Sequence, residues 1–138
     1  MRTSTLLNIE AGLMEPTDTY RMPKSLTEPF PDGWPYDLGW TWVARRGREP
    51  VGVLYAGLCQ NIVIVMMVRS NEKHALVPLF RAFAADCQQR GHKAYMVYLN
   101  PEKPEQLKIA KIAQKAGAII FPQVMIGMGG SFESAVKW

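Results

Sequence analysis

Two cysteines and two histidines are the residues of this chain best suited by type to bind a metal or act as nucleophiles. Cys59 and Cys87 form no CxxC pair, and His74 and His92 form no HExxH pattern. The spacing therefore excludes the common zinc sites and zinc enzymes. Two cysteines in a chain of 138 residues are typical of buried thiols in a cytoplasmic protein, and one disulfide is the alternative.

Charge is unevenly distributed along the chain. Residues 1–40 hold three basic and six acidic residues, a net charge of −3, whereas residues 41–138 hold thirteen basic and six acidic residues, a net charge of +7. A basic body with a mildly acidic head favours an anionic ligand for the body. The composition alone does not identify that anion.

Nucleic acid and membranes are not the partners that we expect. Lys108, Lys111 and Lys115 share one helix face, and residues 45–48 form a basic turn, but no nucleic-acid motif accompanies them. Lysines at helical spacing are typical of a solvated face. No apolar run reaches the 18 residues of a membrane helix, and the N-terminus lacks a secretory signal pattern. We therefore expect a cytoplasmic location.

The first part of the chain predicts little regular structure. A strand is expected around Thr5–Ile9, ending at Gly12, and residues 13–38 are interrupted by prolines, which leave room for at most a short helix. Four aromatic residues at the end of this segment are expected to fix it onto the core: Trp34, Tyr36, Trp40 and Trp42.

Regular elements follow from residue 40. Strands are predicted over 40–45, 50–58, 61–69, 93–99 and 118–126, with a glycine turn at 127–130 and a last strand over 131–138. The run at 61–69 is apolar without alternation, which predicts a central strand covered on both faces. Apolar residues at helical spacing predict helices over 75–90 and 104–116, with Pro78 in the first turn. In the first helix the residues expected to face the core are Leu76, Leu79, Phe80, Phe83 and Cys87.

This order predicts the sheet topology. The segment 61–99 reads strand–helix–strand, so its two strands are expected to be parallel, and the other strands are expected to be antiparallel. The fold class is therefore α/β (α+β), with a mixed, mostly antiparallel sheet, one central parallel pair and flanking helices. We expect one domain over residues 1–138, irregular over 1–40 and regular over 41–138.

The order and lengths of the elements resemble those of the GNAT superfamily of acyl-CoA N-acyltransferases. In that family the parallel strands splay apart around the pantetheine arm, and a loop of the form Arg/Gln-x-x-Gly-x-Gly/Ala holds the pyrophosphate. Here Ser70 stands at the Arg/Gln position, Lys73 at the first glycine and Ala75 at the last small position. The resemblance implies acetyl-CoA as co-substrate, contacted by Met67, Val68, Ser70, Asn71, Lys73, His74, Ala75 and Asn100.

The sequence departs from the family pattern at several positions. Lys73 replaces the glycine that lets backbone approach a phosphate, so Lys73, Arg69 and a protonated His74 would have to supply side-chain charge. Asn100 matches an asparagine common at that strand end, where asparagine before proline is also a frequent turn residue. Ala113 stands in place of the tyrosine that often acts as general acid.

No catalytic residue is assigned from the sequence. The strand at 61–69 carries no carboxylate, and Glu10 and Tyr98 are the two candidates for a base elsewhere. The resemblance implies an N-acyltransferase that moves an acetyl group to an unidentified small-molecule or protein amine. The alternative is a catalytically silent GNAT-like binding or structural protein. The acidic residues of 13–38 would suit a cationic amine, and the predicted C-terminal hairpin could pack against a second copy in a homodimer.

Overall fold

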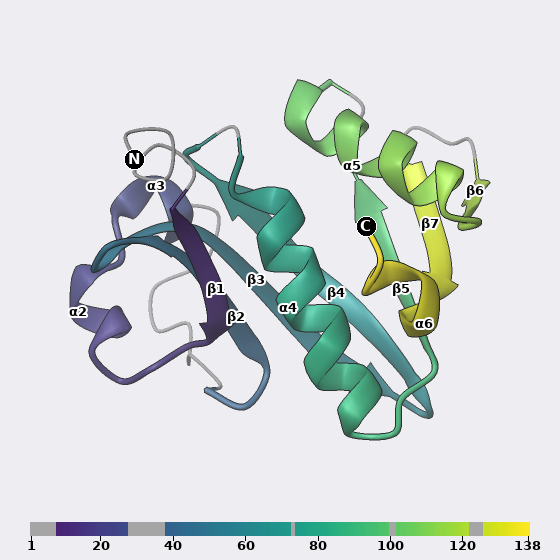
Figure 1. Cartoon of the computed structure of the whole chain (residues 1–138), viewed down its shortest axis with the longest axis horizontal. Helices are drawn as coiled ribbons and strands as arrows, with labels where there is room; N and C mark the ends of the chain where they lie inside the picture. Colours follow the sequence, from purple (N-terminus) through teal and green to yellow (C-terminus); the bar gives the residue numbers. More distant parts are fainter. Residues whose placement is uncertain (1–7, 28–37, 73, 100–101, 122–125) are drawn as a thin grey trace.

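The computed structural model describes residues 8–27, 38–72, 74–99, 102–121 and 126–138, which fold around one sheet of seven strands. The strand order is β1-β2-β3-β4-β5-β7-β6 (Figure 1). The elements are β1 (Ile9–Leu13), α2 (Asp18–Arg21), α3 (Lys24–Thr27), β2 (Thr41–Arg46), β3 (Glu49–Cys59), β4 (Ile62–Ser70), α4 (Leu76–Gln89), β5 (Ala94–Leu99), α5 (Pro104–Lys115), β6 (Ile119–Phe121), β7 (Ile126–Ser131) and α6 (Phe132–Ala135).

The pairing of the strands confirms the predicted fold class. β4 and β5 are parallel, and each other pair of neighbouring strands is antiparallel. The crossover between the parallel strands carries α4 across one face of the sheet (Figure 1). No helix among the described residues is long and apolar enough to cross a membrane.

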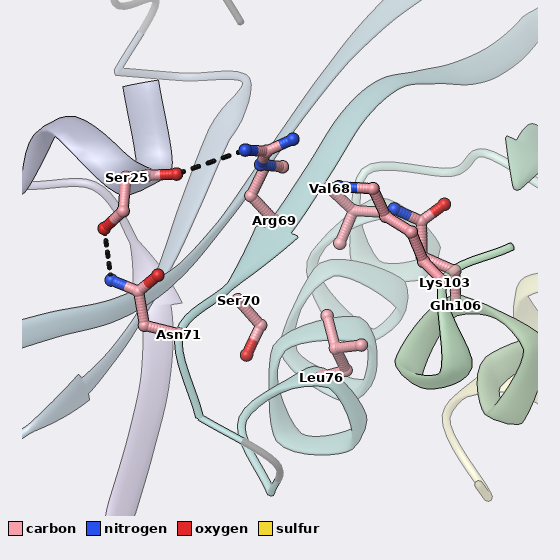
Figure 2. Close-up of a pocket in the computed structure, with 8 residues that line it drawn as sticks. All are labelled: Ser25, Val68, Arg69, Ser70, Asn71, Leu76, Lys103 and Gln106. Carbon is pink, nitrogen blue, oxygen red and sulfur yellow. Dashed lines mark hydrogen bonds between the residues drawn. The ribbon is translucent and has the colours of Figure 1, made fainter. Parts of the chain in front are cut away.

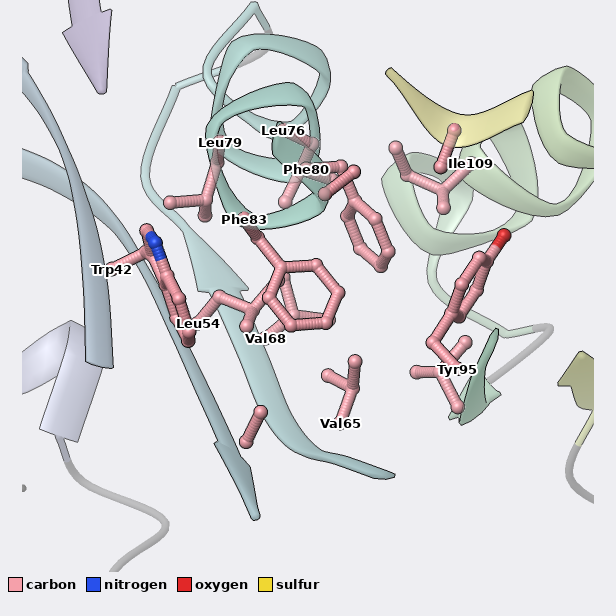
Figure 3. Close-up of a cluster of buried hydrophobic side chains, with 14 of the residues drawn as sticks. Trp42, Leu54, Val65, Val68, Leu76, Leu79, Phe80, Phe83, Tyr95 and Ile109 are labelled. Carbon is pink, nitrogen blue, oxygen red and sulfur yellow. The ribbon is translucent and has the colours of Figure 1, made fainter. Parts of the chain in front are cut away.

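The main core lies between α4 and the sheet. All five apolar residues that the helical spacing placed on the inner face of α4 are buried, and Pro78 lies in the first turn, as predicted. The rings of Trp42 and Phe83 meet edge to face with centroids 5.0 Å apart, in a cluster that also includes Phe80 and Tyr95 (Figure 3). Trp42 Nε1 donates to a carboxylate oxygen of Asp86 at 2.7 Å, so the one polar group of this buried ring is satisfied.

The opposite face of the sheet carries a smaller core under the irregular segment. Met14 and Leu26 pack there on Val43 and Val53 of β2 and β3. The segment holds two four-residue helices where at most one was predicted. Trp42 and, in part, Trp40 are buried in the core as expected, whereas Trp34 and Tyr36 lie outside the described residues.

The prediction that β4 is covered on both faces is wrong for part of the strand. Tyr55 pairs with Met67 and Ala56 with Val65, so Met66 is an extra residue in a bulge. The bulge keeps Val65 and Val68 buried in the main core and leaves Met66 63% exposed. Only part of this apolar run is therefore covered on both faces.

The secondary structure predicted for the end of the chain is also wrong. The glycine-rich segment expected to be a turn is the strand β7, and the expected last strand begins as the helix α6. Ser131 caps this helix by accepting the N–H of Ser134 at 3.2 Å. β1 spans Ile9–Leu13, later in the chain than the strand predicted around Thr5–Ile9. The part of that prediction before residue 8 lies outside the described residues.

The two cysteines differ from the expectation of two buried thiols. Both are free, and Cys87 is buried on α4, but Cys59 is exposed at the end of β3. Burial raises the pKa of the Cys87 thiol to about 12. Cys59 is the last residue of β3, next to the β3–β4 turn.

Candidate functional site

The parallel strands part before they end. Their ladder joins Val63 to Tyr95, Ile64 to Met96 and Val65 to Val97. Beyond Val65, β4 runs on to Ser70, and the described strands have no further parallel pair between them. The separation begins at the Met66 bulge and widens toward the carboxyl ends of both strands (Figure 1). In open α/β sheets, ligands bind outside the carboxyl ends of parallel strands.

A pocket of about 170 Å³ lies at this edge of the sheet (Figure 2). Leu76, the first residue of α4, and Lys103, the N-cap of α5, both line it, so two helix N-termini converge there. Helix N-termini carry partial positive charge. The full lining is Ser25, Val68, Arg69, Ser70, Asn71, Leu76, Lys103 and Gln106. Two of these described residues are cationic and none is acidic, so the pocket suits an anion.

Three backbone N–H groups of the loop between β4 and α4 have acceptors within the protein. The N–H of Asn71 bonds to the carbonyl of Val51 at 2.8 Å, and the N–H of Ala75 bonds to the carbonyl of Glu72 at 3.3 Å. Ser70 Oγ accepts the N–H of Glu72 at 3.1 Å and donates to the carbonyl of the same glutamate. Because these three N–H groups already have acceptors in the protein, they are not available to an anion in the pocket.

The acidic residue of this loop is paired with an arginine and does not line the pocket. Arg46 at the end of β2 makes three hydrogen bonds to the carboxylate of Glu72, the shortest at 2.6 Å. These bonds hold the pKa of Glu72 below its ordinary value. A second ion pair joins Asp18 of α2 to Arg45. Arg45 and Arg46, the two arginines that β2 contributes to the basic turn at 45–48, are therefore both in ion pairs.

Three of the residues predicted to contact a cofactor meet in the pocket: Val68, Ser70 and Asn71. His74 is exposed in the adjoining loop, and Met67 packs toward the smaller core on the other face of the sheet. Ala75 is fully buried, and its Cβ would lie 3.5 Å from a Cβ on Gly52, so a small residue is needed there for packing. Lys73 and Asn100 lie outside the described residues.

Three lining residues were not anticipated. Lys103 and Gln106 stand at the start of α5, and the expectation that parallel strands end at one edge could have indicated them. Ser25 comes from α3 and has no local signal in the sequence. Its hydroxyl oxygen accepts from Asn71 Nδ2 at 2.7 Å, and its carbonyl accepts from Arg69 Nη2 at 3.4 Å (Figure 2).

No described group is positioned as an obvious general acid or base. Glu10 is exposed on β1 at the far edge of the sheet, and the side chain of Tyr98 lies outside the description. Burial raises the pKa of Tyr95 to about 12, which keeps its hydroxyl protonated near neutral pH. Ala113, at the place of the family tyrosine, is fully buried in α5. The described residues contain no cluster of metal-binding side chains.

Comparison of the sequence with known proteins finds no matching family model and no similar curated protein. Solved structures do match. TTHA1254 from Thermus thermophilus, in a variant form, superimposes with a TM-score of 0.63 at 23% identity, over 83% of this chain and 92% of that one.

Two further solved structures have the same fold. Arabidopsis thaliana Naa50, in complex with the bisubstrate analogue CoA-Ac-MVNAL, gives a TM-score of 0.64 at 12% identity, over 89% of this chain and 98% of that one. A GNAT-family acetyltransferase from Staphylococcus aureus gives a TM-score of 0.62 at 11% identity, over 90% of this chain and 99% of that one. The chain therefore has the GNAT fold.

Proposed function

We propose that this protein is an N-acyltransferase that takes an acetyl group from acetyl-CoA and transfers it to an amine. The GNAT fold supports this activity class. The observation that carries the proposal is the pocket at the parting strands, which has two cations and no acidic residue among its described lining. A phosphate-bearing thioester donor is the ligand class that fits such a pocket in this fold.

The side chains around the pocket have distinct roles in this proposal. Arg69 and Lys103 pair with phosphate oxygens, and Ser70, Asn71 and Gln106 offer polar contacts at its rim. Val68 and Leu76 supply apolar wall for the pantetheine arm. His74 and Lys73 belong to the same loop, and Met67, Ala75 and Asn100 complete the set of expected contact positions. Acetyl-CoA would supply the thioester carbonyl that the amine attacks.

Catalysis in this proposal rests on positioning. The chain holds the donor between the parted strands, so that the amine meets the carbonyl in a fixed orientation. With alanine at position 113, the leaving thiolate takes its proton from water or from the amine nitrogen, which becomes cationic as it attacks the carbonyl. An amine acceptor is part of the proposal, while the homodimer and the cytoplasmic location stay predictions from the sequence.

Calorimetric titration with CoA and acetyl-CoA, followed by a free-thiol assay over a panel of amines, tests the proposal. We expect saturable binding and amine-dependent thiol release. Lys103→Ala should weaken CoA binding roughly tenfold, the loss expected for one charge-assisted contact. Lys93→Ala, an exposed lysine at the other end of β5, should leave it unchanged. Absence of binding at millimolar ligand would overturn the proposal, and binding without transfer to any amine would favour the silent GNAT-like protein.

A further inference from the structure

A short helix from the first part of the chain reaches the pocket. α3 has four residues, and its buried residue, Leu26, packs into the smaller core with 0% of its surface exposed. The preceding residue, Ser25, is exposed and lines the pocket. Because Leu26 anchors the backbone of α3, packing in the smaller core sets the position of Ser25 at the pocket.

Ser25 contacts two pocket residues that belong to the end of β4 and the loop after it. Its hydroxyl oxygen accepts from Asn71 Nδ2 at 2.7 Å, and its carbonyl accepts from Arg69 Nη2 at 3.4 Å (Figure 2). The main chain of Asn71 is held separately, by the bond from its N–H to the carbonyl of Val51 at 2.8 Å. One serine therefore restrains the side chains of two residues that are proposed to bind the donor.

Restraint of these side chains before a ligand arrives favours binding. Long polar side chains lose rotamer freedom when they bind a ligand, and contacts that restrict them beforehand lower that cost. A guanidinium has five N–H donors and an amide nitrogen has two. One hydrogen bond from each side chain to Ser25 therefore leaves both Arg69 and Asn71 with donors for a phosphate or another polar group of the ligand.

We infer that Ser25 is a positioning residue for the acyl donor and that it makes donor affinity depend on the docking of α3. Ser25 acts through Asn71 and Arg69 and not on the reacting atoms. The inference rests on the proposed acyl transfer and adds a coupling between the pocket and the first part of the chain. Such a coupling is reciprocal, so a bound donor must stabilise the docked position of α3 by the same factor.

A double-mutant cycle tests the positioning role. Ser25→Ala removes the hydroxyl and keeps the carbonyl, so we expect CoA binding to weaken about three- to tenfold by calorimetry, the loss expected for one hydrogen bond. The KM for acetyl-CoA should rise by the same factor, while kcat stays within twofold. In an Asn71→Ala background, Ser25→Ala should cause no further loss, because the partner of the hydroxyl is gone.

Two single variants provide the controls for this cycle. Ser25→Thr keeps a hydroxyl and should bind CoA within twofold of the parent protein. Thr27→Ala removes a hydroxyl from the same helix at a position that does not line the pocket, and it should change neither affinity nor KM. The urea midpoint of Ser25→Ala should equal that of the parent protein.

Limited proteolysis tests the reciprocal effect. Arg21 and Lys24 are exposed at the end of α2 and the start of α3, where trypsin can cleave after local opening. Saturating CoA should slow cleavage at these two residues at least threefold in the parent protein. Most of this protection should be lost in Ser25→Ala. Cleavage after Arg48, an exposed residue in the turn between β2 and β3, should be insensitive to CoA in both proteins.

The outcomes separate this inference from the proposed function. Absence of CoA binding to the parent protein would overturn the proposed function, and the inference with it. Binding that Ser25→Ala leaves unchanged, or protection from trypsin that is equal in the two proteins, would overturn the inference alone. Equal losses from Ser25→Ala with and without Asn71 would make Ser25 a direct ligand contact and overturn its positioning role. A lowered urea midpoint together with no recovery in Ser25→Thr would assign Ser25 to structure and also overturn that role.

Discussion

The guanidinium of Arg46, at the end of β2, donates hydrogen bonds to the carboxylate of Glu72, in the loop between β4 and α4. Arg46 Nε lies 2.9 Å from Oε1 and 3.0 Å from Oε2, and Nη2 lies 2.6 Å from Oε2. Glu72 follows Ser70 and Asn71, which line the pocket. The arginine therefore compensates an acidic residue that would otherwise stand beside the pocket proposed to bind an anion.

Removing this compensation should weaken binding of CoA. In Arg46→Gln the carboxylate of Glu72 loses its partner and repels the phosphates, so we expect roughly two- to fivefold weaker binding by calorimetry, as for an exposed ion pair. The difference should shrink at high salt because exposed charges are screened.

A second substitution separates repulsion from damage to the fold. Glu72→Gln in the Arg46→Gln background should restore affinity, because no charge is then left unpaired. Arg48→Gln, at an exposed position of the same hairpin, is the matched control and should have no effect. Equal weakening in the single and double variants would show that Arg46 acts through local structure and not through charge.

The ion pair between Asp18 and Arg45 should make stability depend on pH. Asp18 is 3% exposed, and it accepts from Arg45 Nε at 2.9 Å and from the N–H of Glu15 at 2.7 Å. Burial alone would raise the pKa of Asp18, but these hydrogen bonds outweigh it and the pKa is lowered. A lowered pKa means that the stabilisation is complete above the ordinary value of 3.8 and is lost as pH falls below it.

Urea unfolding of Asp18→Asn should reveal this contribution. At pH 7 we expect a loss of about 2 kcal/mol, because Arg45 is left partly buried without its counter-ion. The difference in free energy of unfolding between the parent and Asp18→Asn should narrow below pH 4. Glu15→Gln, an exposed neighbour, should stay within about 0.5 kcal/mol of the parent. A difference in free energy of unfolding that is the same at pH 7 and at pH 3 would contradict a stabilising role for the Asp18–Arg45 ion pair.

The parts of the fold that depend on local pattern could be predicted from the sequence. The inner face of α4, its start near Pro78 and the parallel relation of β4 and β5 follow from spacing, proline chemistry and connection length. The Met66 bulge could not be predicted in this way, because one extra residue in a run of apolar side chains leaves no local mark. A bulge is defined by the partner strand, here Tyr55 and Ala56 of β3.

The candidate site was only partly predictable for a similar reason. Val68, Ser70 and Asn71 lie next to one another in sequence, so a loop resemblance was enough to indicate them. Ser25 and Lys103 reach the same pocket from α3 and α5, and long-range packing alone brings them there. The acidic residues of 13–38 suggested a site that attracts a cationic amine. One of them, Asp18, forms an ion pair with Arg45 instead.

The two thiols should react at very different rates in the native protein. Cys59 is exposed, whereas Cys87 is fully buried and its pKa is raised to about 12 by burial. A disulfide reagent should titrate one thiol quickly and the second at least about a thousandfold more slowly, after opening of the core. Cys59→Ser should abolish the fast phase. Two fast thiols in the parent protein would contradict the buried position of Cys87.

Gly130 in β7 lies directly opposite Tyr95 in β5, and its lack of a side chain makes room for that ring. A Cβ there would lie 2.9 Å from the Tyr95 hydroxyl oxygen and 3.1 Å from Cζ. Tyr95 is 2% exposed and cannot move away freely, so Gly130→Ala should destabilise the fold by about 1–3 kcal/mol in urea unfolding. Tyr95→Phe in that background removes the nearest atom and should recover part of the loss. Gly129→Ala is the matched control, because its Cβ would lie at an ordinary 3.6 Å from the Tyr95 carbonyl oxygen. Equal destabilisation by the two alanines would mean that β7 needs glycine for its backbone and not for the tyrosine ring.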